Sequence, residues 1–194
     1  SETVWRQADH YQIPRIAFVN KMDRVGADFK QCVREIHDRL GADPVVIALP
    51  IGSEENFAGV IDLVEQRALR FDESSQGLTV VKEEIPDDLK EESSAARMTL
   101  LEKLADFDED VMEKFLDDNE VAPEELHRSL RKATLSLGLV PVLCGSAFKN
   151  KGVQPLLDSV IRYLPSPLDI PPVSGEGKKG EEVTRKADKQ EKEE

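Results

Sequence analysis

The sequence has 194 residues, of which 39% are hydrophobic and 34% are charged, and its formal net charge is −13 at pH 7. This length is enough for one large domain or for one domain with a satellite. A chain this acidic is not suited to broad binding of the nucleic-acid backbone, which needs Lys and Arg to displace counterions. The sequence shows no apolar run long enough to span a bilayer and no signal peptide, so we expect no membrane contact and a cytoplasmic location.

The cysteines and the start of the sequence add two expectations. Cys32 and Cys144 have no Cys or His neighbour at metal-ligand spacing, so we expect no metal site. Two isolated cysteines also fit a reducing cytosol better than a disulfide framework. The sequence begins at Ser1 within an apparent helix, which suggests a piece of a longer protein.

The first fifty residues alternate between helix and strand patterns. Helical spacing of apolar residues predicts a helix over 1–11. The apolar run at 16–19 predicts a short strand that is buried on both faces of a parallel sheet. Apolar residues then trace one face of a helix over 29–40, and a further apolar run predicts a strand over 44–50.

The middle of the sequence has a mixed pattern. Strand-like alternation at 60–71 and 78–85, on either side of a polar turn, predicts a small sheet. Helical patterns follow at 87–104, 109–116 and 123–137. A connection of this length with its own strands and helices is a subdomain rather than a loop.

The strand-then-helix pattern returns near the end. Residues 139–144 form a second buried apolar run, and 152–164 predict a helix that packs through Val153, Leu156, Leu157, Val160 and Ile161. Strands separated by helices predict a parallel α/β sheet that binds ligands at the carboxyl ends of its strands. From residue 174 onward there are almost no apolar residues, so we expect a disordered tail or linker.

A polar loop, Asn20-Lys21-Met22-Asp23, follows the first apolar run directly. Guanine presents two adjacent donors, its ring N–H and its exocyclic amine, and one carboxylate such as Asp23 can accept from both. Lys21 can lay its alkyl stem along a flat base, and Asn20 can bond to neighbouring loops through its amide. Alone, this pattern is equally compatible with an ordinary turn at a strand end.

A second loop, Gly145-Ser146-Ala147-Phe148-Lys149, follows the second buried run. The small residues let the backbone approach a planar base, so the Ala147 N–H could donate to the guanine oxygen, which adenine lacks. Ser146 could support the loop through its hydroxyl, and Phe148 or Lys149 could cover the face of the base. A small-residue strand end is the simpler interpretation of this loop alone. Together, however, the two loops favour a guanine site, because both follow buried strands and both precede helices.

The two loops and their flanking residues resemble one family. IPRIAFVNKMDRVGADF at 13–29 and CGSAFKNKGVQPLLDSVIRYLPSP at 144–167 are similar to the fourth and fifth nucleotide-binding motifs of elongation factor G. The resemblance extends from residue 1 to about residue 173 and implies a partial P-loop GTPase-type parallel sheet with an inserted α+β subdomain. The implied domains are G-domain parts at 1–47 and 132–173, the insert at 48–131, and a tail at 174–194.

The resemblance also implies a ligand, GTP or GDP, that this sequence holds through base contacts only. The implied guanine-binding residues are Asn20, Lys21, Met22, Asp23, Ser146, Ala147 and Phe148. The sequence contains no G-x-x-x-x-G-K-[ST] motif and no segment that resembles the switch regions. Phosphate binding, Mg²⁺ and hydrolysis would therefore depend on residues outside it, and so would most contacts with RNA.

The insert carries an acidic stretch that is a candidate docking surface. The resemblance implies a ribosomal partner, the stalk protein, which would bind through Asp88, Glu91, Glu92 and Glu102. Most runs of charge are only the solvated face of a helix, and that alternative applies to each of these residues.

Three functions follow from these observations. The first is a part of the ribosomal translocation GTPase, elongation factor G. The second is a paralogue used for ribosome recycling or protection, which shares the same motifs. The third is a non-catalytic protein-docking module, which fits the missing phosphate-binding loop.

Overall fold

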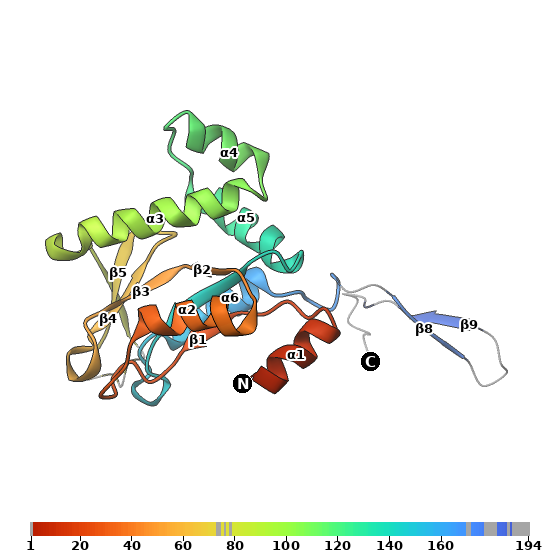
Figure 1. The fold of residues 1–194 in the computed structure, drawn as a ribbon, viewed down its shortest axis with the longest axis horizontal. Helices are drawn as coiled ribbons and strands as arrows, with labels where there is room; N and C mark the ends of the chain where they lie inside the picture. The colour runs from red at the N-terminus through yellow and green to blue at the C-terminus, as the bar shows by residue number, and fades with distance from the viewer. Residues whose placement is uncertain are drawn as a thin grey trace, which may run out of the picture. The chain divides into compact units, whose positions relative to one another are not determined.

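The computed structural model of the chain describes residues 2–72, 75, 77, 79–169, 172–176, 182–185 and 187. Its contacts form two compact units, Ser1–Leu164 and Pro165–Glu194, which we describe separately. The first unit contains a parallel sheet and an antiparallel sheet, with helices packed around them (Figure 1).

The parallel sheet has three strands in the order β1-β7-β2. All five residues of the central strand β7 (Val140–Cys144) are buried, as its continuous apolar pattern predicts. Strand β1 (Ala17–Val19) follows helix α1 (Glu2–His10) and lies at the edge of this sheet. The prediction that β1 is buried on both faces is wrong, because an edge strand has a neighbour on one side only and its three residues are partly exposed.

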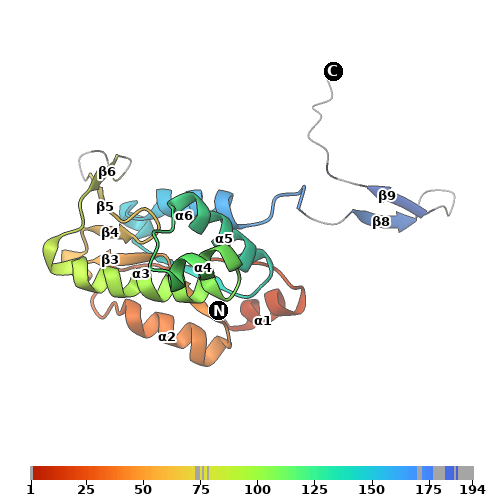
Figure 2. The ribbon, with the colours of Figure 1, turned by 90° about the horizontal axis from the view of Figure 1, so that it is seen from above.

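Helix α2 (Phe29–Leu40) forms where the sequence predicts it. The Asp28 carboxylate caps its start by accepting from the Gln31 N–H at 2.8 Å, and Gly41 ends it in the left-handed conformation with φ 66°. Helix α2 and helix α6 (Val153–Tyr163) lie on opposite sides of the parallel strands (Figure 2).

Helix α6 packs differently from its prediction. Its buried residues are Ser159 and Tyr163. Three of the residues predicted to pack are exposed: Leu157 by 56%, Val160 by 40% and Ile161 by 79%. The apolar spacing therefore locates the helix correctly, but the side that faces the core is the side that carries Tyr163.

The second sheet is antiparallel, and its four strands follow chain order. They are β3 (Ala48–Ile51), β4 (Gly59–Asp62), β5 (Arg67–Phe71) and β6 (Val80–Glu83). The prediction of one strand over 44–50 is wrong, since β2 (Pro44–Val46) belongs to the parallel sheet and β3 to the antiparallel one. Ile47 joins the sheets: its N–H donates to the Val142 carbonyl and its own carbonyl accepts from the Leu63 N–H, both at 3.0 Å.

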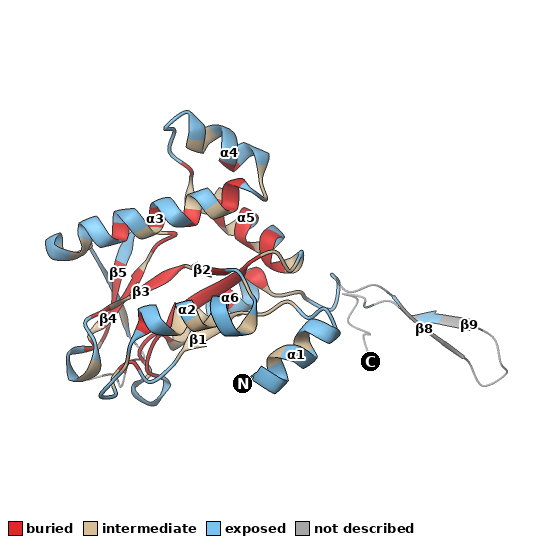
Figure 3. Cartoon of the chain, in the orientation of Figure 1, coloured by how far each residue is buried: buried red, intermediate tan, exposed pale blue. Residues whose placement is uncertain are grey.

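Three helices complete the first unit: α3 (Lys90–Ala105), α4 (Glu109–Leu116) and α5 (Pro123–Leu135). The buried residues of α3 lie on the side that faces the strands, as Figure 3 shows. The core around these helices is continuous with the core around β7, so both sheets share one apolar interior. No helix in the described part of the chain is both long and apolar enough to cross a membrane.

The predicted borders of the insert run through this shared structure. The first border, at 47/48, coincides with the passage from one sheet to the other at Ile47. Helix α5 continues across the second, at 131/132. Because Ser1–Leu164 is one compact unit, the division into G-domain parts and an insert stays a prediction.

The second unit contains a two-stranded antiparallel ribbon of β8 (Val173–Glu176) and β9 (Glu182–Arg185). The sequence predicts disorder or a linker from residue 174 onward. A lone two-stranded ribbon is marginally stable at best in water. Apart from this ribbon and position 187, the predicted tail lies outside the described residues.

Candidate functional site

The two polar loops meet at the carboxyl edge of the parallel sheet. Strands β1 and β7 are parallel neighbours, and Val19 pairs with Cys144 at their ends. Just beyond this pair the Gly145 N–H donates to the Val19 carbonyl at 3.0 Å, and the Met22 N–H donates to the Gly145 carbonyl at 3.1 Å. The chain therefore brings together two segments that are more than a hundred residues apart in sequence.

The Asn20 side chain is the direct link between the loops. Its Oδ1 atom accepts from the Lys21 N–H at 2.8 Å and from the Ala147 N–H at 3.0 Å. The Ala147 N–H, which the sequence analysis treats as a free donor for a base, is thus already occupied. A base that used this N–H would have to replace Asn20 as its acceptor.

The Asp23 carboxylate lies against the second loop, close to Ser146 and Lys149. The Asp23 side chain is only 10% exposed, and its Oδ2 atom is 3.7 Å from the Lys149 ammonium. The neighbouring Ser146 hydroxyl lowers the pKa of the Asp23 carboxyl most strongly, burial acts in the opposite direction, and Lys149 and Arg24 lower it further. The net lowering keeps this carboxylate ionised and able only to accept hydrogen bonds.

The Ser146 hydroxyl has an unusual environment. Ser146 is 1% exposed, and the described residues offer its Oγ atom no hydrogen bond of ordinary geometry. We therefore attribute its effect on the Asp23 pKa to a nearby dipole rather than to a fixed donor. A buried hydroxyl next to an ionised carboxylate can rotate to serve either the protein or a ligand.

The three other residues predicted to bind guanine differ in the solvent exposure of their side chains. The Met22 side chain is 1% exposed and lies in the core, so this residue offers only its backbone to the loop. Lys21 is exposed and has a left-handed backbone with φ 65°, which is uncommon for a residue with a side chain. Phe148 is 95% exposed, so its ring is free to cover a flat ligand.

Comparisons with known proteins agree with this geometry. Residues 1–166 match the family described as the elongation factor Tu GTP binding domain. The chain belongs to this family. It is 62% identical over 192 residues to elongation factor G 2 of Desulfotalea psychrophila, and the match covers 99% of this chain and 28% of that protein.

A solved structure supports the same assignment. The fold is similar to a crystal structure of a protein from Thermus thermophilus, with a TM-score of 0.74 and 29% identity over 88% of this chain and 26% of that one. These comparisons confirm the resemblance predicted from the two loops, and they confirm the partial GTPase-type α/β fold. The chain spans only 28% and 26% of the lengths of these two proteins.

The residues that hold the two loops of this GTP-binding domain in place could not be predicted from the sequence. The Glu54 carboxylate accepts from the Gly26 N–H at 2.7 Å, and the Lys151 ammonium donates to the Phe57 carbonyl at 3.2 Å. A Cβ atom on Gly145 would lie 2.3 Å from the Lys151 carbonyl oxygen, so only glycine fits there. The glycine is visible in the sequence, but nothing local marks Glu54 or Lys151.

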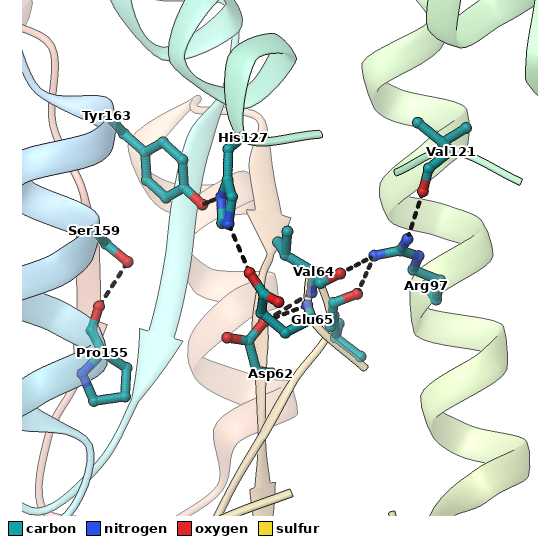
Figure 4. Close-up of polar contacts among 10 residues, drawn as sticks. Asp62, Val64, Glu65, Arg97, Val121, His127, Pro155, Ser159 and Tyr163 are labelled. Carbon is teal, nitrogen blue, oxygen red and sulfur yellow. Dashed lines mark hydrogen bonds and ion pairs between the residues drawn. The ribbon is translucent and has the colours of Figure 1, made fainter. Parts of the chain in front are cut away.

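A partly buried polar network joins the segment that follows β4 to helices α3, α5 and α6 (Figure 4). His127 Nδ1 lies 2.7 Å from the Tyr163 hydroxyl, and its Nε2 lies 3.1 Å from Glu65 Oε1. The Arg97 guanidinium donates to the carbonyls of Leu63, Val64 and Val121. These contacts fix the helices against the sheet, and none of them reaches the two loops.

The predicted docking residues are all exposed, but they are not equivalent. Asp88 lies in the short 3₁₀ turn Asp87–Leu89 before α3, and Glu92 forms an ion pair with Lys30 of α2 at 2.7 Å. Glu91 and Glu102 are eleven residues apart, so they share one face of α3. Met98 lies between them on that face and is 52% exposed. We call Glu91, Met98 and Glu102 the α3 stripe.

Metal-binding side chains do not gather in the described part of this domain. Among the described residues, no three His, Cys, Asp or Glu side chains come close enough to hold an ion. The Mg²⁺ that the family resemblance implies therefore finds no ligand set among these residues.

Proposed function

We propose that the chain is the guanine-recognising part of a translational GTPase of the elongation factor G type. The observation that supports this proposal is the meeting of the two loops: Asn20 Oδ1 accepts from the Ala147 N–H at 3.0 Å, and the Asp23 carboxylate lies 3.7 Å from the Lys149 ammonium. An amide group and a carboxylate therefore lie close to each other at the ends of β1 and β7. Guanine needs that pair of groups, because it has an acceptor oxygen beside two donors. Adenine has the opposite pattern and would leave both protein groups without partners.

In this proposal each loop residue has a defined part. Asp23 accepts from the ring N–H and the exocyclic amine of guanine, as an ionised acceptor of lowered pKa. Ala147 exchanges Asn20 for the guanine oxygen. The exposed Lys21 and Phe148 cover the two faces of the base, and Ser146 supports Asp23.

The proposal covers base recognition and leaves the reaction to other residues. The sequence contains no phosphate-binding G-x-x-x-x-G-K-[ST] motif, and phosphoryl transfer depends on positioning of phosphates, metal and water. We therefore propose that GTP hydrolysis, Mg²⁺ binding and coupling to the ribosome belong to the complete protein. A GTPase used in ribosome recycling or protection would share every feature of this site.

We also propose that the α3 stripe docks the ribosomal stalk protein. Its two carboxylates flank an exposed methionine, which suits a partner that has basic residues around an apolar patch. This arrangement favours Glu91 and Glu102 over Glu92, whose carboxylate is already paired with Lys30.

The substitution Asp23→Asn in the complete protein tests base recognition. An amide can donate where the carboxylate only accepts, and xanthine has a carbonyl where guanine has the amine. We expect GDP binding to weaken about tenfold to a hundredfold while xanthosine diphosphate gains affinity, as measured by competition against a fluorescent nucleotide.

The matched control is Asp38→Asn, which changes an exposed carboxylate on α2 that lies beside His37. It should leave both affinities unchanged. If Asp23→Asn preserves the preference for guanine, the assignment of Asp23 and with it the proposed base site are wrong.

A further inference from the structure

One short turn of the antiparallel sheet contacts both loops of the proposed base site. It spans Ser53–Phe57, between β3 and β4, and includes the 3₁₀ segment Glu54–Asn56. It begins after Gly52, whose φ is 74° and where a Cβ atom would lie 2.2 Å from the Asn56 carbonyl oxygen. The turn is therefore tightly closed and can act as a rigid support.

Glu54 forms hydrogen bonds with the first loop on both sides of Asp23. Its backbone N–H donates to the Met22 carbonyl at 2.9 Å, and its carboxylate accepts from the Gly26 N–H at 2.7 Å. Glu54 itself has a left-handed backbone with φ 55°, a conformation that costs free energy for a residue with a side chain. The two bonds fix the residues immediately before Asp23 and shortly after it.

Phe57, at the other end of the turn, contacts the second loop. Its carbonyl accepts from the ammonium of Lys151, which is only 7% exposed. The backbone of Lys151 is in turn paired with Ser146, with N-to-O distances of 2.8 and 3.0 Å. Burial of an ammonium group is costly unless it is hydrogen-bonded, so this contact holds the second loop at a defined position.

We infer that Glu54 is a positioning residue for guanine discrimination, acting through the loop that carries Asp23. This inference rests on the proposed base site. A carboxylate that accepts from two donors at once depends on its angle as well as its distance. If the Gly26 N–H loses its acceptor, the segment after Asp23 can pivot, and the bond to the guanine amine is lost first.

The test compares GDP with inosine diphosphate, which lacks the exocyclic amine. In the complete protein, Glu54→Ala should weaken GDP binding about three- to tenfold and weaken inosine diphosphate binding less, so the ratio of the two affinities moves toward one. Glu54→Gln should restore the wild-type ratio, since its amide oxygen can accept from Gly26. The neighbouring exposed residue provides the control, Glu55→Ala, which should change neither affinity.

A purely structural role for Glu54 would lower both affinities equally and leave the ratio unchanged, and that result would overturn the inference. If Glu54→Ala is recovered unfolded, Glu54→Asp keeps the charge but shortens the side chain, and the same ratio is measured. Asp23→Asn is run in parallel. If it alters base preference while Glu54→Ala does not, the positioning role fails and the base site stands. If neither variant alters base preference, both fail.

Discussion

Gly145 joins the two loops through hydrogen bonds of its backbone. A Cβ atom there would lie 2.3 Å from the Lys151 carbonyl oxygen and 2.6 Å from the Phe18 ring. The loop cannot retreat from this contact without breaking the 2.8 Å bond from the Ser146 N–H to the same carbonyl. Any side chain at this position must therefore move Ser146 away from Asp23.

We accordingly predict that Gly145→Ala lowers the free energy of unfolding by about 1–3 kcal/mol and weakens GDP binding severalfold. Urea denaturation and nucleotide titration of the complete protein measure the two effects. The control is Gly41→Ala, where a Cβ atom meets nothing within 4 Å and only the left-handed backbone is strained. It should cost about 1–2 kcal/mol and leave nucleotide binding intact. Wild-type binding by Gly145→Ala would contradict the prediction.

The meeting of the two loops could be predicted because each loop follows an apolar run, and parallel neighbours end at the same edge of a sheet. The guanine-binding roles of their residues stay predictions. The supports of these loops could not be predicted. Glu54 contacts Gly26 across 28 positions, and Lys151 contacts Phe57 across 94. No local pattern marks a glutamate or a lysine whose partner is a distant backbone atom. The occupied state of the Ala147 N–H was hidden for the same reason.

At the scale of elements, Tyr163 is where helix α6 joins the rest of the first unit. It is 1% exposed, and its hydroxyl lies 2.7 Å from His127 Nδ1 on α5. His127 also contacts Glu65, so it connects two helices with the antiparallel sheet. Burial raises the pKa of the Tyr163 hydroxyl, which keeps it protonated and available to His127.

Removal of this hydroxyl should therefore be costly. We predict that Tyr163→Phe lowers the free energy of unfolding of the 194-residue chain by about 1–3 kcal/mol, because the partly buried His127 side chain loses the hydrogen-bond partner that the buried Tyr163 hydroxyl provides. Tyr11→Phe is the matched control, since Tyr11 is 70% exposed, and it should change stability by less than about 0.5 kcal/mol. Equal stability of the two variants in urea denaturation would show that the network contributes nothing.

Helices were easier to predict than strands in this chain. Helix α2 has a capping aspartate, Asp28, at its start and a glycine, Gly41, at its end, so both ends can be predicted from the sequence. The apolar run at 44–50 has no such mark at Ile47, where the chain leaves one sheet for the other. Both halves are buried, and a continuous apolar pattern does not distinguish one buried strand from two.

At the scale of the whole chain, the acidic net charge of −13 acts on any partner at long range, whereas docking needs a local surface. The α3 stripe allows these two effects to be separated, because other exposed carboxylates lie on α4 and directly after it. Glu113 and Asp117 are also exposed and carry the same charge, but they are not part of the stripe. Two double variants can thus change the net charge equally while only one of them changes the stripe.

We predict that Glu91→Lys with Glu102→Lys weakens binding to the purified stalk protein about tenfold at low salt and flattens the dependence of binding on salt. Glu113→Lys with Asp117→Lys should weaken it less than about threefold, because steering by distant charges is screened beyond about 10 Å at 0.1 M salt. Calorimetric titration at two salt concentrations measures both.

Equal losses from the two double variants would mean that net charge alone attracts the partner, and no loss from either would remove the stripe as a docking surface. GDP affinity should stay at the wild-type value in both, since no hydrogen bond or ion pair among the described residues joins the stripe to the loops that carry Asp23 and Ala147.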